Sequence, residues 1–275
     1  MFQNGVGRTF FLEDDFQDQT QNWSGSSRAP TADNPDRDIR TNFATAGFQA
    51  MFNRSWGVQL SVPYESRHFE TTGGATGADP VSLDWSGPGD LRIRGIYTGF
   101  SPDLSSGLTF GLKLPTGSFT HNDAFGDIDR DTEIGSGSTD VLLGGFSRGD
   151  LAAGHGWSWF AQADLDLPEF ARDQYRPGLE VDAAAGMYHR GWTIGTATIT
   201  PMAQVKVSAR ARDSGARATI PVASGFRRIL IAPGIEWDMH PVAVYADVEV
   251  PVYQHFIGNQ LSAPVLFKLS ASYMF

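Results

Sequence analysis

Cysteine is absent from this chain of 275 residues. Without a thiol there can be no thiolate metal site, no cysteine nucleophile and no disulfide framework. Long apolar runs are missing too: no stretch reaches the ~18 consecutive apolar residues of a transmembrane helix, so we expect none. Basic residues are few, with 21 Lys and Arg against 31 Asp and Glu, and the net charge of −10 argues against nucleic acid as a partner.

Aromatic residues are plentiful, and the last stretch of the chain shows how they are arranged. Residues 264–275 alternate with a period of two, and one face carries Val265, Phe267, Leu269, Ala271, Tyr273 and Phe275. The other face is mostly polar. This stretch resembles the closing strand of a bacterial outer-membrane β-barrel, in which each strand turns an apolar face to lipid and its second face to the lumen.

The same period of two recurs along the chain. We expect a weaker first strand at 8–16 and clear strands at 39–52, 56–69, 89–100, 107–119, 137–148, 157–167, 178–189, 199–210, 226–237, 242–253 and 264–275. Bacterial single-chain barrels have even strand numbers, which favours twelve. The sequence therefore predicts an all-β protein, a transmembrane antiparallel up-and-down β-barrel of about 12 strands. It forms one domain over 1–275, with the first strand and a long loop in 1–38 and clear strands in 39–275.

The connections between these segments alternate in length. Short links lie at 53–55, 101–106, 149–156, 190–195 and 238–241, and long ones at 17–38, 70–88, 119–136, 168–177, 211–225 and 255–263. Outer-membrane barrels have short periplasmic turns and longer external loops. The pattern predicts a location in the outer membrane of a Gram-negative bacterium with both termini periplasmic. Because no basic and then apolar leader follows Met1, we expect that any signal peptide has been removed.

A soluble β-sandwich or lipocalin-like barrel would also alternate. Its apolar face would point inward and its outer face would be charged, whereas the charges here are few per strand and of mixed sign. Strands of about eleven to fourteen residues also exceed the usual length in soluble proteins. Both observations favour the membrane barrel.

The predicted inward face carries the candidate functional residues. The expected lumen-lining residues are Arg92, Arg94, Lys113, Asp140, Asp164, Asp166, Glu180, Asp182, Lys206, Arg210, Arg228, Glu236, Asp247, Glu249 and Lys268. These charges could line a polar permeation path that sets ion preference, or pair into a closed interior that only supports the barrel. The expected membrane-interface aromatics are Trp56, Trp157, Trp159, Trp192, Trp237, Tyr273 and Phe275, which lie beside short links or the C-terminus.

The predicted loop at 119–136 is strongly acidic. Asp127, Asp129, Asp131 and Glu133 recur at every second position, so their oxygens could hold a hard cation such as calcium. The spacing lacks the glycine and the final glutamate of an EF-hand loop. A solvated external loop that meets divalent ions bridging lipopolysaccharide is the favoured interpretation.

Three short motifs add a family resemblance. Residues 87–91 (GPGDL), 111–117 (GLKLPTG) and 135–140 (GSGSTD) resemble the outer-membrane proteins grouped as the "MetA-pathway of phenol degradation" transporter-like family. The resemblance implies an exported barrel associated with the breakdown of aromatic compounds. Prolines and glycines in these motifs would end one strand at the outer rim and restart the next.

Together these features predict a channel or transporter-like barrel for passive passage of small solutes, apolar or aromatic in class. The alternative is a closed structural or interaction barrel that anchors a complex. Expected partners are outer-membrane lipid, lipopolysaccharide and a small solute, with a protein partner through the long loops as a further option. No enzyme is expected, because the six histidines, His68, His121, His155, His189, His240 and His255, stand in no local catalytic motif. No cofactor is expected apart from the calcium option.

Overall fold

The structure, a computed structural model, describes residues 7–73, 77–122, 128–151, 156–218 and 223–275. Its strands are β1 (Gly7–Gln19), β2 (Gln21–Gly25), β3 (Ser27–Arg28), β4 (Asp38–Met51), β5 (Trp56–Gly73), β6 (Asp79–Pro88), β7 (Leu91–Tyr97), β8 (Ser106–Leu114), β9 (Ser138–Asp150), β10 (Trp157–Ala171), β11 (Glu180–His189), β12 (Trp192–Ile194), β13 (Ala197–Arg210), β14 (Phe226–Met239), β15 (Val242–Ser262) and β16 (Leu266–Met274). Two 3-10 turns are η2 (Thr31–Asp33) and η3 (Arg130–Thr132). Within these ranges no helix has the length and hydrophobicity to cross a membrane.

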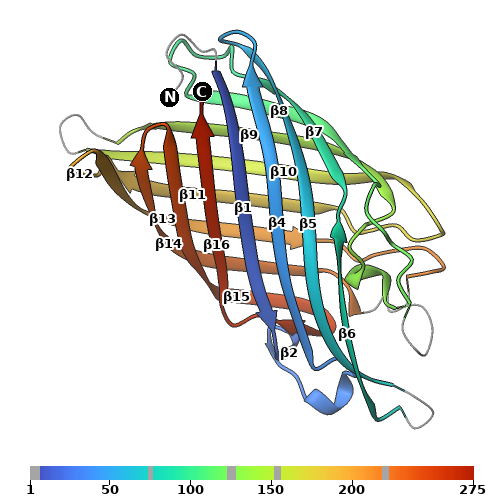
Figure 1. Ribbon diagram of the computed structural model, residues 1–275. Helices are drawn as coiled ribbons and strands as arrows, with labels where there is room; N and C mark the ends of the chain where they lie inside the picture. The colour runs from blue at the N-terminus through green and yellow to red at the C-terminus, as the bar shows by residue number, and fades with distance from the viewer. Residues whose placement is uncertain (1–6, 74–76, 123–127, 152–155, 219–222) are drawn as a thin grey trace.

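Twelve antiparallel strands close into a barrel in the described part of the chain (Figure 1). They are β1, β4, β5, β7, β8, β9, β10, β11, β13, β14, β15 and β16, each paired with the next. The barrel closes at β1, which pairs with β4 on one side and with β16 on the other. The predicted fold class is confirmed, and so is the weak first strand. Its alternation is blurred because Glu13, Asp14 and Asp15 place carboxylates on both faces.

The apolar face of the strands points outward. On β5, Leu60, Val62 and Tyr64 are 40%, 41% and 51% exposed, whereas Gln59 and Ser61 line the interior. Large exposed hydrophobic side chains recur in this way around the barrel. A continuous apolar exterior is the opposite of a soluble barrel and is the surface that lipid requires.

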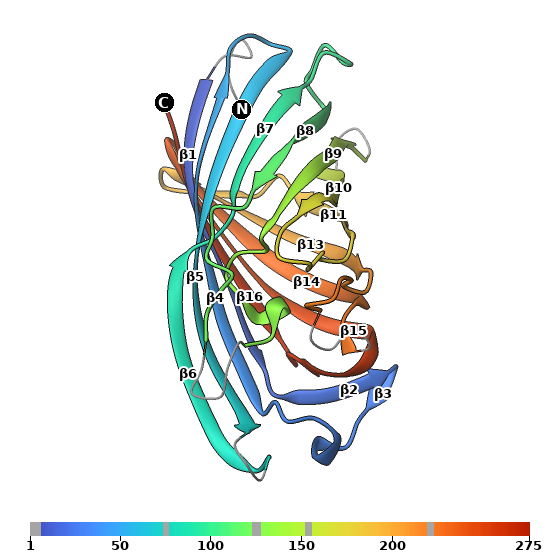
Figure 2. The same ribbon diagram turned by 90° about the vertical axis from the view of Figure 1, so that its right-hand side faces the viewer.

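Three predicted long loops are wrong in part. In the predicted loop 70–88, β5 continues to Gly73 and pairs with β6, and β15 continues through the predicted loop 255–263 to Ser262. The predicted loop 17–38 contains the end of β1 and the short strands β2 and β3, and β2 pairs with β15. Figure 2 shows the β5–β6 hairpin projecting as an arm beyond the barrel, with β15 and β2 extending on the opposite side. These strand extensions could not be recognised from the sequence because Gly, Thr and Ser weaken the apolar alternation. Their backbone N–H and C=O groups still form the hydrogen bonds of a strand.

One barrel strand is interrupted. β6 and β7 both pair with β5, and they are separated by Gly89 and Asp90. β7 also pairs with β8, whereas β6 has no second strand partner among the described residues. The chain between β8 and β9 turns inward on this side (Figure 2), where Ile128 and Ile134 pack against Phe69 and Trp85. The barrel therefore carries a hydrophobic cluster on the inner face of the arm.

Candidate functional site

The candidate site is a cavity of about 780 Å³ inside the barrel. Nine of the predicted lumen-lining residues border it: Arg92, Arg94, Lys113, Asp140, Asp166, Glu180, Arg210, Arg228 and Glu249. Asp164 borders a smaller pocket nearer the short turns, and Asp247 and Lys268 border a mainly apolar groove of about 480 Å³. Asp182, Lys206 and Glu236 line none of these three spaces.

Acidic groups outnumber basic ones around the cavity, and most are paired. On β8, Lys113 Nζ contacts Asp140 Oδ2 on β9 and lies 3.4 Å from Asp166 Oδ2 on β10. Asp140 is fully buried, so removing Lys113 would leave a carboxylate without water or a counter-charge. This cluster fixes three adjacent strands to one another.

A second cluster joins β13 to β15 across β14. Lys206 Nζ contacts Glu249 and lies 3.2 Å from Asp247 Oδ2, which also accepts hydrogen bonds from Gln204 and Tyr245. Asp247 is 4% exposed. Five side chains thus form one connected polar network in this part of the interior.

A third pairing lies at the closure of the barrel. Lys268 Nζ on β16 lies 2.5 Å from Glu13 Oε1 and 3.1 Å from Asp15 Oδ2 on β1. The acids that blur the first strand in the sequence therefore meet the one lysine of the last strand. This ion pairing adds side-chain contacts to the backbone pairing of β1 with β16.

Four charged side chains that border the cavity have no ion pair or hydrogen bond among the described residues: Arg92, Asp131, Glu180 and Arg228. The Arg228 guanidinium lies 4.9 Å from the centre of the Phe226 ring, an arrangement that keeps its charge beside an aromatic face. These groups are free to face a solute or water.

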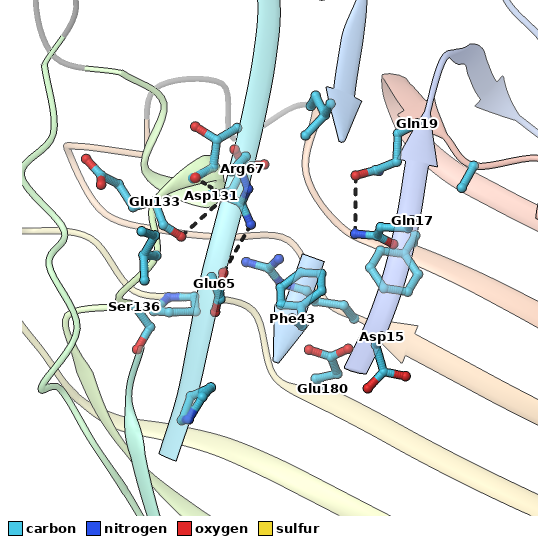
Figure 3. A pocket seen from close by; sticks show the side chains of 18 of the residues that line it. Asp15, Gln17, Gln19, Phe43, Glu65, Arg67, Asp131, Glu133, Ser136 and Glu180 are labelled. Carbon is cyan, nitrogen blue, oxygen red and sulfur yellow. Dashed lines mark hydrogen bonds and ion pairs between the residues drawn. The ribbon is translucent and has the colours of Figure 1, made fainter. Parts of the chain in front are cut away.

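The segment between β8 and β9 is held inside the barrel by Arg67. Its guanidinium on β5 lies 3.3 Å from Glu65 and donates to the backbone carbonyls of Thr132 and Glu133 (Figure 3). Arg67 is 8% exposed. Its cost of burial is offset by this carboxylate and by the loop carbonyls, so Arg67 ties the loop to the wall.

Asp90 is the second anchor of this segment, and it explains the three sequence motifs. Its carboxylate accepts hydrogen bonds from Gly117 N (2.9 Å), Ser136 N (2.8 Å) and Ser136 Oγ (2.6 Å). Thr116 Oγ1 donates to Gly89 O at 3.0 Å. A Cβ on Gly135 would lie 2.3 Å from Gly117 O, so only glycine permits this approach. Residues 87–91, 111–117 and 135–140 thus meet at one point. We call this the Asp90 latch.

Further loops close over the same end of the barrel. Tyr175, between β10 and β11, is 2% exposed and donates from its hydroxyl to Asp213 Oδ2 at 2.8 Å. Burial raises the pKa of the Tyr175 hydroxyl, so it remains a donor. Arg130 lies between the rings of Phe119 and Tyr175, at 4.6 and 4.7 Å from their centres. Three loops are joined in this way.

The acidic segment proposed for calcium is not a solvated external loop. Glu133 is 7% exposed and accepts from His121 N through Oε1, and both Asp129 and Asp131 border the inner cavity. Asp131 is exposed to the cavity, but desolvation by the surrounding protein and the neighbouring Asp129 raise its pKa to about 7. Asp127 lies outside the described residues. In the part of the chain that is described no three metal-ligating side chains gather, so calcium binding stays a prediction.

The predicted interface aromatics lie near the short-turn end. Trp56, Trp157, Trp192, Trp237, Tyr273 and Phe275 are between 41% and 60% exposed, and Trp159 is half-buried. Several contact one another or neighbouring rings, such as Tyr273 and Phe275, whose centres are 5.9 Å apart. Exposed aromatics at one level of an apolar exterior are typical of the lipid–water boundary.

The described histidines include His255, whose Nδ1 lies 3.0 Å from Ser26 Oγ on the exposed surface, and His68, which has a carboxylate on each ring nitrogen. The Nδ1 of His68 lies 2.8 Å from Asp84 and its Nε2 3.3 Å from Glu70, on the outer face of the arm. Because carboxylates occupy both ring nitrogens, neither is available to take a proton from a serine. His155 lies outside the described residues.

Sequence comparison finds no match: no protein family fits the chain, and no curated protein does. The fold is similar to an outer-membrane channel from Pseudomonas putida, with a TM-score of 0.69, 11% identity, and coverage of 100% of this chain and 97% of that one. It is also similar to the β domain of the Bordetella autotransporter BrkA (0.55; 12%; 98% and 100%) and to the CymD monoaromatic hydrocarbon channel (0.51; 11%; 98% and 88%). The chain has the fold of an outer-membrane β-barrel, as the sequence resemblance implied.

The anchors of the inward loop were not identified from the sequence. Arg67 lies in an alternating strand whose inward positions are mostly polar, and Asp90 stood within a motif interpreted only as a turn. The usable signal was the glycine beside each motif, because glycines mark close backbone approach.

Proposed function

We propose that the protein is an outer-membrane channel for the passive passage of small solutes, apolar or aromatic in class. The observation that carries this proposal is the cavity of about 780 Å³ enclosed by twelve strands and bordered by unpaired charges. Phe11, Phe43, Phe226 and Phe256 also border it and offer aromatic surface to a solute. The likeness in fold to channels, one of them named for monoaromatic hydrocarbons, supports the same function.

The proposed orientation follows from the loop lengths. The short turns and both termini face the periplasm, and the arm, the inward loop and the loops around Tyr175 face the exterior. The apolar exterior contacts lipid, and the polar outer face of the arm, with His68, Glu70 and Asp84, lies at the level of lipopolysaccharide. The proposal involves no catalysis.

Conductance in a planar bilayer tests the channel. We expect discrete steps from the purified protein, and Arg92→Ala should shift ion selectivity toward cations because it removes a cavity charge that has no counter-charge in contact. Arg190→Ala is the matched control, since Arg190 pairs with Asp150 on an exposed turn, and it should leave selectivity unchanged. Folded protein that gives no steps would contradict the channel.

A closed structural barrel is the second candidate. It is favoured by the inward loop and by the paired charges around Lys113, Lys206 and Lys268, which occupy much of the interior. Such a barrel would anchor partners through its long loops. A silent bilayer, together with a correctly folded protein that shifts on heating in gel electrophoresis, would favour it.

A further inference from the structure

Two water-accessible spaces adjoin inside the barrel. The main cavity lies toward the long loops, and a second pocket of about 380 Å³ lies toward the short turns, bordered by residues such as Met51, Thr98 and Leu104. Two residues border both spaces, Gln59 and Arg94. A solute that crosses from one space to the other must pass this boundary.

Arg94 does not stand free at the boundary. Its Nη1 lies 2.6 Å from Asp164 Oδ1, which borders the second pocket. Arg94 is on β7 and Asp164 on β10, so the ion pair passes over the two strands between them, β8 and β9. The Arg94–Asp164 ion pair thus links two strands that are not neighbours, whereas Lys113 and Asp140 lie opposite each other on adjacent strands.

Glycines on the two intervening strands leave room for this ion pair. Gly111 pairs with Arg94 on β8, and Gly144 pairs with Asp164 on β9. A Cβ on Gly144 would lie 2.6 Å from Asp164 Oδ1 and 2.5 Å from Thr109 Oγ1. Because position 144 has no side chain, the Asp164 carboxylate has room to reach Arg94.

The ion pair can open without stranding a charge. The side chains of Arg94 and Asp164 are 20% and 35% exposed, so each retains contact with water. Asp140 and Asp247, in the clusters around Lys113 and Lys206, have side chains that are fully buried, and separating their partners would leave them uncompensated. Unlike the clusters around Lys113 and Lys206, the ion pair between the two spaces is therefore suited to break and re-form.

We propose that the Arg94–Asp164 ion pair is the constriction that a solute must pass between the main cavity and the periplasmic pocket, and that these two residues determine which solutes cross. This inference rests on the proposed channel function, because a constriction selects solutes only if solutes cross the barrel. The narrowing between the two spaces can be measured whether or not the barrel conducts. A paired guanidinium and carboxylate at a narrowing select by size and by charge, because a solute must either fit beside them or separate them.

The absence of cysteine makes a direct test simple. Gln162→Cys places a thiol in the periplasmic pocket, and Thr45→Cys places one in the main cavity as the matched reporter. Each is made in the parent chain, with Arg94→Ala, and with Asp164→Ala. The protein is reconstituted in vesicles loaded with glutathione, and a charged, membrane-impermeant thiol reagent is added outside. Trypsin added outside then cleaves the long loops of those molecules whose loops face outward, and labelling is scored in these molecules alone.

We expect the cysteine at 45 to react at one rate in all three backgrounds. The cysteine at 162 should react slowly in the parent and roughly tenfold faster with either alanine variant, because the constriction is then open. Equal reaction at 162 in the parent and the variants, whether fast or slow, would overturn the proposal. Heat-modifiable migration establishes that each variant is folded.

The labelling is separable from the channel function. A silent bilayer combined with Arg94-dependent labelling would refute an open channel and still support the constriction. Conductance that is unchanged by Arg94→Ala, with labelling unchanged as well, would refute the constriction and leave the channel standing.

Discussion

The Asp90 latch should control whether the inward loop stays in the barrel. Asp90 is 6% exposed, and its carboxylate accepts two backbone N–H groups and one hydroxyl. In Asp90→Ala both N–H groups lose an ionised acceptor, each worth about 1.5–3 kcal/mol. Taking the low end for both, we expect the free energy of local loop opening to fall by about 3 kcal/mol, which raises the open population roughly a hundredfold.

Trypsin cleavage after Arg130 reports this opening. Arg130 is 6% exposed and stacked between two rings, so the peptide bond is protected while the loop is packed. When opening and closing are fast, cleavage follows the open population, and the Asp90→Ala protein should be cut roughly a hundredfold faster at this bond. The barrel should remain folded, because its strands pair without the loop.

The matched control is Asp150→Ala. Asp150 also accepts hydrogen bonds from a serine and a charged side chain, Ser158 and Arg190, but on an exposed turn at the other end of the barrel. Its loss should leave cleavage at Arg130 unchanged. If Asp90→Ala is cleaved at Arg130 as slowly as the parent, the latch does not hold the loop and the reasoning is refuted.

Two further outcomes follow from the structure. In the packed loop the pKa of Asp131 is raised from its usual 3.8 to about 7, so packing favours the protonated acid. The contribution of this group to the stability of the packed loop is therefore full below about pH 4 and is lost as the pH rises toward 7. The ratio of cleavage at Arg130 to that at exposed Arg217 should rise about tenfold from pH 5 to pH 8, because cavity water screens part of the effect, and Asp131→Asn should abolish the rise. On adjacent residues of β5, Leu60→Lys should destabilise the barrel in lipid by about 2–4 kcal/mol in urea unfolding, whereas Gln59→Lys, on the cavity side, should cost far less; equal costs would mean that the lipid-facing side is wrongly assigned.

The strand pattern was predictable because the barrel imposes it at every position. A period of two is set by the covalent geometry of the extended chain, and lipid outside with water inside converts that period into alternating chemistry. Leu60, Val62 and Tyr64 could therefore be assigned to the exterior, and twelve strands could be counted, without knowledge of any contact.

Local irregularities were not predictable in the same way. Simple alternation places Tyr253 on the lumen face, but a bulge makes Val252 an extra residue, and Tyr253 is 45% exposed on the outside. The period-two rule cannot anticipate a bulge, because one inserted residue reverses the face of all that follow.

The sequence by itself determined the class of fold, the outward face and the residue types of the interior, since these follow from repeating local geometry and from solvent. Only the tertiary structure decided how the interior is used. Arg94 meets Asp164 70 residues away, and Asp90 meets Ser136 46 residues away. Neither contact can be recognised from a periodic pattern in the sequence. The Arg94–Asp164 contact depends on the curvature of the barrel wall, and the Asp90–Ser136 contact depends on where the loop folds.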